Sequence, residues 1–170
     1  ERVSVWLFNE DLSEIVCMDL FTQSKNRHEK GAVLSVKQYP RYFKALEESR
    51  IINADDACND PRTNEFTEDY LSVYGITSMM DAPVFLHGKT IGVVCHEHTG
   101  PIREWTLDEQ NFAGSIADMI SLALENSERR ILEERLSALN LYSGKLNTAI
   151  NLQQIYELTL DAMEKTLGFE

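Results

Sequence analysis

The chain has 170 residues, of which 43% are hydrophobic, and this is enough for one folded core and excludes a disordered chain. Its 28 acidic residues outnumber its 16 basic residues, and the resulting net charge of −12 disfavours nucleic acid or an anionic membrane as a partner. We find no apolar run long enough to cross a bilayer and no secretory signal, so we expect no direct membrane contact.

The first half of the chain predicts short strands and short helices. An opening hairpin is expected from strands over 2–8 and 12–21, followed by a short strand over 32–37. Pro40 suits the first turn of a helix that carries Tyr42 and Phe43, and Ile51-Ile52 indicates another short strand. A helix is predicted over 63–74 and is ended by Gly75.

Residues 78–100 predict a β-hairpin that turns at 87–89, and each of its arms alternates between two faces. The opening strand shows the same division, with Val3 and Val5 on an aliphatic face and Trp6 on a mixed one. We predict that the aliphatic face lies under helices and that the mixed face, with Asp81, His96 and His98, lines a cavity. The aliphatic set on the two arms is Met80, Ala82, Val84, Leu86, Ile91, Val93 and Cys95.

The last third of the chain is predicted to be helical. Thr106 and Glu109 form a capping box, and apolar residues then recur at helical spacing. From Leu132 the spacing alternates between four and three residues, which is a heptad pattern and predicts a homodimer through this helix. Gly144 weakens the helix by roughly 1 kcal/mol relative to alanine, so we expect a break near it and a further helix that ends around Gly168. The heptad seam consists of Leu132, Leu136, Leu139, Ser143, Leu146 and Ile150.

Several segments together resemble a GAF domain, the small sensory module of many signalling proteins, over residues 1–127. They are RVSVWLF at 2–8, DACNDPRT at 56–63, DAPVF at 81–85, GVVCHEH at 92–98, and Trp105 with the helix after it. The resemblance implies an α+β fold with a central antiparallel sheet of about six strands and helices on one face. It also implies a ligand pocket on the other face, roofed by residues 39–74, and a long C-terminal signalling helix.

The resemblance also implies a division of the chain. Residues 1–127 are expected to form a GAF-like domain that lacks the usual N-terminal helix, and 128–146 a coiled-coil-like linker. Residues 147–170 resemble the opening helix of a second GAF domain. Because the first helix is missing, we predict that the back of the sheet borrows the helix at 152–167 from a neighbouring chain.

The predicted ligand-binding residues come from two sources. Bilin-binding GAF domains use positions that match Trp6, Met79, Asp81 and His98. The roof contributes Tyr42, Phe66 and Tyr70, whose alternative role is ordinary core packing, and the mixed face contributes His96.

The family's known ligands are not reproduced in full. The Cys-His pair that attaches a bilin is absent ahead of the roof helix, where the chain reads NEFTEDY at 64–70, and the cyclic-nucleotide pattern is absent too. Cys95 and Glu97 alternate with His96 and His98 along a strand, which leaves too few ligands on one side for a metal site. A haem iron bound through His96 or His98 stays open, and the cofactor is unknown.

Catalysis is not expected. The three cysteines, at positions 17, 58 and 95, are odd in number and fit no disulfide framework, which is typical of the cytoplasm. We expect Cys17 and Cys95 to be buried and Cys58 to lie in an acidic loop, so none has the setting of a nucleophile.

The sequence therefore predicts a non-catalytic sensory domain of a signalling protein such as a histidine kinase, with a small-molecule ligand and a downstream output domain. Two alternatives remain. One is a dimerisation and spacer module without a ligand, and the other is a small redox enzyme of the methionine-sulfoxide reductase type.

Overall fold

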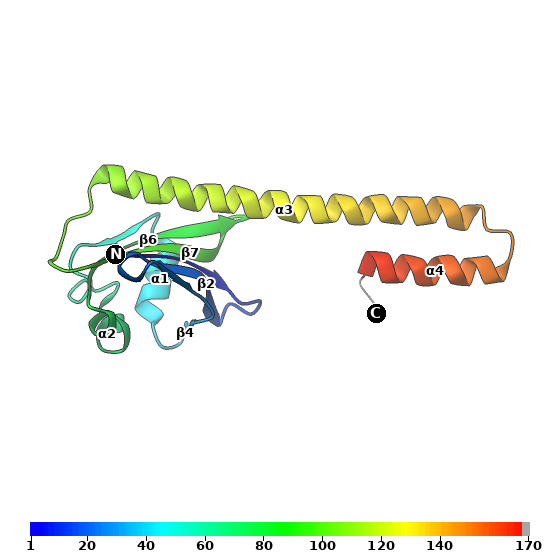
Figure 1. Ribbon diagram of the computed structural model, residues 1–170. Coiled ribbons are helices and arrows are strands. Elements are labelled where there is room, and N and C mark those ends of the chain that lie inside the picture. Colours follow the sequence, from blue (N-terminus) through cyan, green and yellow to red (C-terminus); the bar gives the residue numbers. More distant parts are fainter. Residues whose placement is uncertain (168–170) are drawn as a thin grey trace. The chain divides into compact units, whose positions relative to one another are not determined.

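The computed structural model describes residues 1–167, and the chain divides into two compact units, 1–122 and a second that begins at Ala123. In the first unit, seven strands form one antiparallel sheet in the order β3-β2-β1-β7-β6-β5, with β4 also paired to β2 (Figure 1). This confirms the predicted α+β fold. The strands are β1 (Arg2–Phe8), β2 (Glu14–Thr22), β3 (Arg27–Glu29), β4 (Val33–Ser35), β5 (Ile52–Ala54), β6 (Ile76–Leu86) and β7 (Lys89–Thr99).

One side of the sheet is covered by short helical segments, which form the roof. They are α1 (Pro40–Glu48), η2 (Asn64–Phe66), η3 (Thr67–Leu71) and α2 (Ser72–Tyr74), and a further turn, η1 (Gln23–Lys25), follows β2. The helix predicted over 63–74 is therefore a succession of a 3₁₀ turn, a π-helical turn and an α turn. Phe66 and Leu71 are both buried and are five residues apart in the sequence. A π turn places residues at this spacing more nearly on the same face of the helix than an α turn does.

The other side of the sheet is covered by the first part of α3 (Leu107–Asn147) (Figure 1). The predicted capping box is present, since Thr106 N donates to Glu109 Oε2 at 2.9 Å and Glu109 N donates to Thr106 Oγ1 at 3.3 Å. Ala113 and Ala117 are buried, and the backbone N–H of Phe85 on β6 donates to Ser121 Oγ at 3.0 Å. Small residues thus let this part of α3 lie close to the sheet.

The β6–β7 hairpin contains a bulge that the sequence pattern did not reveal. Its turn at His87-Gly88 is as predicted, with both residues at positive φ. Phe85 pairs with Thr90, but Val84 pairs with Gly92, so Ile91 is skipped. An extra residue on one strand reverses which face every later side chain of that strand occupies.

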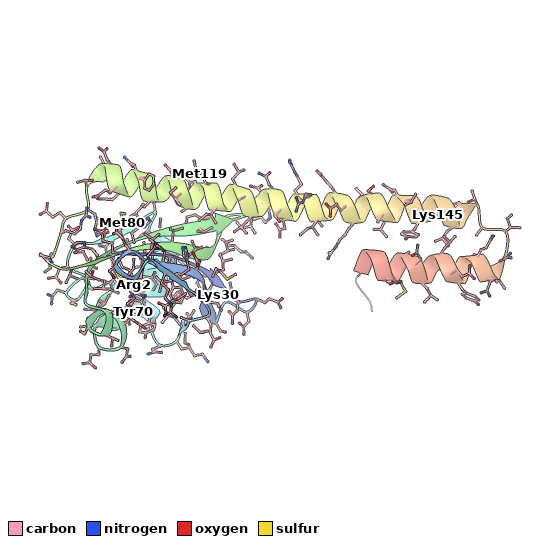
Figure 2. The ribbon with its side chains drawn as sticks, viewed as in Figure 1. Arg2, Lys30, Tyr70, Met80, Met119 and Lys145 are labelled. Carbon is pink, nitrogen blue, oxygen red and sulfur yellow. The ribbon has the colours of Figure 1, made fainter. Side chains whose placement is uncertain are left out.

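The bulge corrects the predicted faces of the sheet. Asp81 pairs with Cys95, whereas Met80 pairs with His96 and Ser78 with His98. Directly paired residues point to the same face, so Asp81 faces the roof while His96 and His98 face α3. The prediction that these three side chains share a face is therefore wrong. Figure 2 shows Arg2 and Tyr70 on the roof side and Met80 toward α3.

The second unit contains the rest of α3 and α4 (Leu152–Leu167). Tyr142 on α3 is buried, and its hydroxyl donates to Asp161 Oδ2 on α4 at 2.5 Å. The seam residues Leu136 and Leu139 remain 60% and 56% exposed. Gly144 stays within α3, so the break predicted near it comes instead after Asn147.

Two further sequence expectations concern the helices. The helix end expected around Gly168 lies outside the described residues. Within residues 1–167, no helix has both the length and the apolar character needed to cross a membrane.

Candidate ligand site

The space between the roof and the sheet is filled by aromatic side chains. The ring of Phe66 lies 4.7 Å from that of Tyr42 and 4.2 Å from that of Tyr39, measured between centroids. All three residues are buried. Their edge-to-face and tilted contacts are those that aromatic rings prefer, so the roof is closed by its own packing.

A small cavity remains beneath these rings, with a volume of about 20 Å³. That is room for about one water molecule. Five of the eight predicted ligand-binding residues line it, so the structure brings this part of the predicted site together, while their role in binding stays a prediction. The lining residues are Trp6, Ile15, Leu34, Tyr42, Phe66, Tyr70, Met79, Cys95 and Glu97.

A buried ion pair lies at one end of this cavity, and sequence reasoning missed it. Arg2 Nε lies 3.3 Å from Glu97 Oε2, and the two side chains are only 7% and 3% exposed. The Tyr70 hydroxyl donates to Glu97 Oε1 at 2.8 Å, and the Arg2 guanidinium lies 4.2 Å from the ring centroid of Tyr74. Burial raises the pKa of Glu97, although the charge of Arg2 and the bond from Tyr70 oppose this. The alternation along β1 could have placed Arg2 on the same face of the sheet as Trp6. Only the register between β1 and β7 identifies Glu97 as the partner of Arg2.

Asp81 is the sixth predicted residue on this side, and it is completely buried. The Tyr42 hydroxyl donates to Asp81 Oδ2 at 2.6 Å, whereas Oδ1 has no hydrogen-bond partner among the described residues. Burial raises the pKa of Asp81 to about 7; the nearby charge of Glu97 adds to this, while hydrogen bonds from Tyr42 and Cys95 oppose it. The Asp81 carboxyl group therefore changes its charge near neutral pH.

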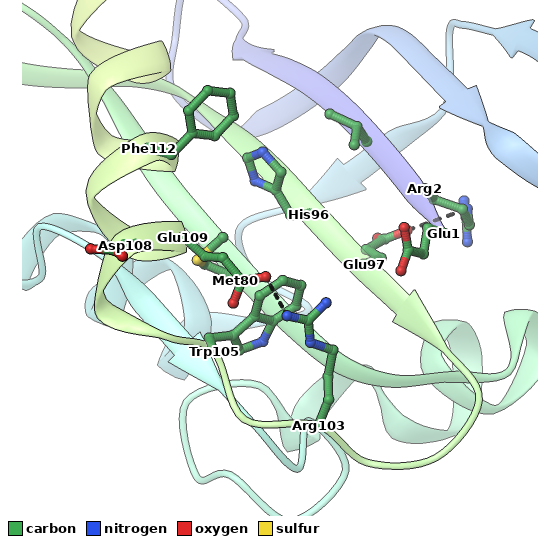
Figure 3. A pocket seen from close by; sticks show the side chains of 11 residues that line it. Glu1, Arg2, Met80, His96, Glu97, Arg103, Trp105, Asp108, Glu109 and Phe112 are labelled. Atoms are coloured by element: carbon green, nitrogen blue, oxygen red, sulfur yellow. Dashed lines mark hydrogen bonds and ion pairs between the residues drawn. The ribbon is translucent and has the colours of Figure 1, made fainter.

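The other two predicted residues, His96 and His98, lie on the α3 side because of the bulge. His96 lines a groove of about 370 Å³ together with Met80, Trp105 and Phe112 (Figure 3). His98 Nδ1 lies 3.4 Å from Glu1 Oε1. A haem held by either histidine over the roof side of the sheet does not fit this arrangement, because both rings face away from a cavity that is itself far too small.

The thiols of Cys17 and Cys95 lack the features of an activated nucleophile. Burial raises the pKa of Cys17 and, well above its ordinary value, that of Cys95, and nearby carboxylates add to both shifts. A reactive thiol needs the opposite environment. Across residues 1–167, no group of three or more His, Cys, Asp and Glu side chains is placed to hold a metal ion.

Comparison with known proteins identifies the family. The sequence model of the GAF domain matches residues 1–124, which is most of the chain, so the chain belongs to the GAF domain family. No curated protein matches the chain.

Solved structures agree at the level of the fold. The chain is similar to the GAF domain of a two-component sensor histidine kinase from Bacillus halodurans, with 21% identity, coverage of 76% of this chain and 84% of that one, and a TM-score of 0.58. It is also similar to the PixJ GAF domain of Thermosynechococcus elongatus in its blue-light-absorbing form, with 17% identity, 82% coverage of each chain and a TM-score of 0.67.

A third similar structure is the GAF domain of the Acinetobacter phosphoenolpyruvate-protein phosphotransferase, with 14% identity, coverage of 75% of this chain and 72% of that one, and a TM-score of 0.54. At these identities the likeness shows a shared fold. The family match and the fold together define a sensory type of domain.

Proposed function

We propose that the chain is a non-catalytic sensory domain of a cytoplasmic signal-transduction protein, which relays the state of its roof site through a dimeric helix. The observation that supports this most directly is the continuity of α3. The same helix that packs Ala113 and Ala117 against the sheet continues to the exposed leucines Leu136 and Leu139. A change in how α3 packs in the first unit therefore acts on an element that also carries the proposed dimer contact.

The relay needs only a difference in preference between two helix arrangements. A ligand that binds more tightly when α3 packs in one of two arrangements increases the population of that arrangement. The coupling free energy equals the difference between the ligand's binding free energies for the two arrangements. Since α3 is one uninterrupted helix over 107–147, no hinge within it is required.

We propose further that the parent protein is a histidine kinase with an output domain after this chain. The likeness to the Bacillus halodurans sensor kinase domain supports this. In this arrangement residues 128–146 are the coiled-coil-like linker and 147–170 open a second GAF domain. The buried thiols, with their raised pKa values, support a non-catalytic role.

The dimer is tested by placing charge in the seam. We expect the double variant Leu136→Glu/Leu139→Glu to sediment as a monomer in analytical ultracentrifugation at a concentration where the unaltered protein is a dimer. Both side chains are exposed within the chain, so the substitutions should leave its fold intact, while burying two carboxylates at a helix interface is strongly unfavourable.

A matched control uses two apolar residues of the same helix that lie outside the seam. Ile131 and Leu141 are 44% and 57% exposed, and the heptad places them away from the Leu136 and Leu139 positions. The variant Ile131→Glu/Leu141→Glu should remain a dimer. A seam variant that is still dimeric, or a control that dissociates equally, would contradict the proposed interface.

The second candidate function, a dimerisation and spacer module without a ligand, is favoured by the small volume of the roof cavity, about 20 Å³. Native mass spectrometry of the purified dimer separates the two functions. A sensor of an organic ligand should retain added mass that is lost on denaturation, whereas a spacer should show the mass of two chains alone.

A further inference from the structure

The roof cavity limits what the site can bind without moving a side chain. Its volume of about 20 Å³ admits one water molecule, and the rings of Trp6, Tyr42 and Phe66 form part of its wall. An organic ligand would have to displace these rings. A proton needs no such space, so a buried titratable group on this side of the sheet can bind one without displacing the rings.

Asp81 and Glu97 are both buried on this face, and the negative charge of Asp81 is the less well compensated of the two. Glu97, on the same face, has Arg2 as a counter-ion and Tyr70 as a donor. Asp81 has one strong donor, the Tyr42 hydroxyl, and its Oδ1 has no partner among the described residues. An ionised carboxylate that is fully buried without a counter-ion is costly, and it lowers this cost by binding a proton.

The other groups that face Asp81 act in both directions: the charge of Glu97 favours the protonated carboxyl group, whereas the hydrogen bonds from Tyr42 and Cys95 favour the charged one. From β7 come Cys95, which is paired with it directly, and Glu97, whose negative charge disfavours a second one nearby. From α1 comes Tyr42, and β5 presents the apolar Ile52 opposite Asp81. The cation Arg2 on this face is already paired with Glu97.

We propose that Asp81 is a proton-binding site through which the domain responds to pH, and that its protonation is transmitted to α1 by the hydrogen bond from Tyr42. This proposal rests on the proposed sensory function and names the proton as the ligand of the same site. When Asp81 loses its proton, the charge on Oδ2 strengthens the bond from Tyr42 and draws α1 toward β6. When the proton returns, this bond becomes a weaker neutral one.

The direction of the response follows from burial. An aspartate in the unfolded chain has a pKa near 4, and burial raises the pKa of Asp81 to about 7. The folded chain therefore takes up one proton as the pH falls through about 7. The side chain is charged above that value and neutral below it.

The test is a titration of the intact 170-residue chain followed by NMR. One aspartate side-chain carboxyl carbon should titrate with a midpoint near pH 7, well above the ordinary range, and the amide resonances of α1 should shift with the same midpoint. In Asp81→Asn both transitions should disappear. In Asp118→Asn, which removes an exposed carboxyl group on α3, both should remain.

The variant Tyr42→Phe isolates the transmission step. Its Asp81 carboxyl carbon should titrate at a higher pH than in the unaltered chain, because the lost hydrogen bond favoured the charged form. The α1 amides should no longer follow that transition. Histidines titrate in the same range, but the carboxyl carbon identifies Asp81 directly.

The proton site is overturned if every aspartate carboxyl carbon titrates below about pH 5, or if the α1 transition persists in Asp81→Asn. Transmission through Tyr42 is overturned if α1 follows the titration unchanged in Tyr42→Phe. These outcomes are independent of the seam variants. Suppose that Asp81 does not titrate near pH 7 but that Leu136→Glu/Leu139→Glu still breaks the dimer. The proposed dimeric relay would then stand, and only the proposal that the proton is its ligand would fall.

Discussion

Replacing Arg2 with methionine should lower the free energy of unfolding by about 3–5 kcal/mol at pH 8, the cost typical of breaking a buried ion pair. Methionine keeps much of the apolar volume, so the main change is that Glu97 stays buried without its counter-ion. Urea unfolding followed by tryptophan fluorescence measures this loss, since Trp6 is buried on the same face of the sheet.

The pH dependence of this loss has a definite sign. Burial already raises the pKa of Glu97, and removing Arg2 takes away a charge that lowered it. The folded variant then favours the protonated carboxyl group, which contributes stability at low pH that is lost as the pH rises. The loss should therefore be smaller at pH 5 than at pH 8.

Two controls separate the buried charge from the loss of an arginine as such. Arg50 pairs with Asp118 at the surface, where both side chains are more than half exposed, so Arg50→Met should cost about 0–1 kcal/mol. The double variant Arg2→Met/Glu97→Gln should recover much of the loss, because no charge is left unpaired. Equal losses for Arg2→Met and Arg50→Met would contradict the importance of this pair.

Replacing Gly92 with alanine should cost about 2–3 kcal/mol, in the range of overpacked cores. Gly92 pairs with Leu7 between β7 and β1, and a Cβ there would collide with the backbone oxygen of Trp6 and lie 2.7 Å from Leu7 Cδ2. Backbone atoms cannot move aside as a flexible side chain can, so the two strands must separate. The midpoint of thermal or urea unfolding reports the change.

Gly144 provides the opposite control. It lies within α3, and a Cβ added there meets nothing within 4 Å. Gly144→Ala should therefore stabilise the helix by up to about 1 kcal/mol. A Gly92→Ala variant as stable as the unaltered chain would show that β1 and β7 are not held this close together.

Local patterns in the sequence were enough for most of the fold. The alternation along residues 2–8, the capping box at Thr106 and Glu109, and the turn at His87-Gly88 all depend on neighbours within a few residues, and each is present as predicted. The aromatic roof was also recognisable from the sequence. Tyr42 and Phe66 each lie on the apolar face of a predicted helix, and that face must be buried when the helix packs on the sheet. The alternative that these rings serve as ordinary packing agrees with the small cavity beneath them.

The candidate site was only partly predictable for a specific physical reason. A hairpin without a bulge would pair Val84 with Ile91 and place the histidines with the mixed face, as the alternation suggested, but the structure pairs Val84 with Gly92. Because Gly92 has no side chain, β7 can approach the backbone of β1 closely at this position. The close approach occurs in the β6–β7 register that skips Ile91. Such a contact joins residues more than eighty positions apart, so no local pattern reports it.

The sequence by itself thus determined most of the strands and helices in order, although not the short strand β3, and the roof aromatics, because these features are written in short-range spacing. Only the tertiary structure decided which polar groups meet. It turned His96 and His98 toward α3, joined Arg2 to Glu97 across two strands, and left Asp81 buried under Tyr42. The reason is that strand register is set by contacts between distant segments, and a shift of one residue moves every side chain of a strand to the opposite face.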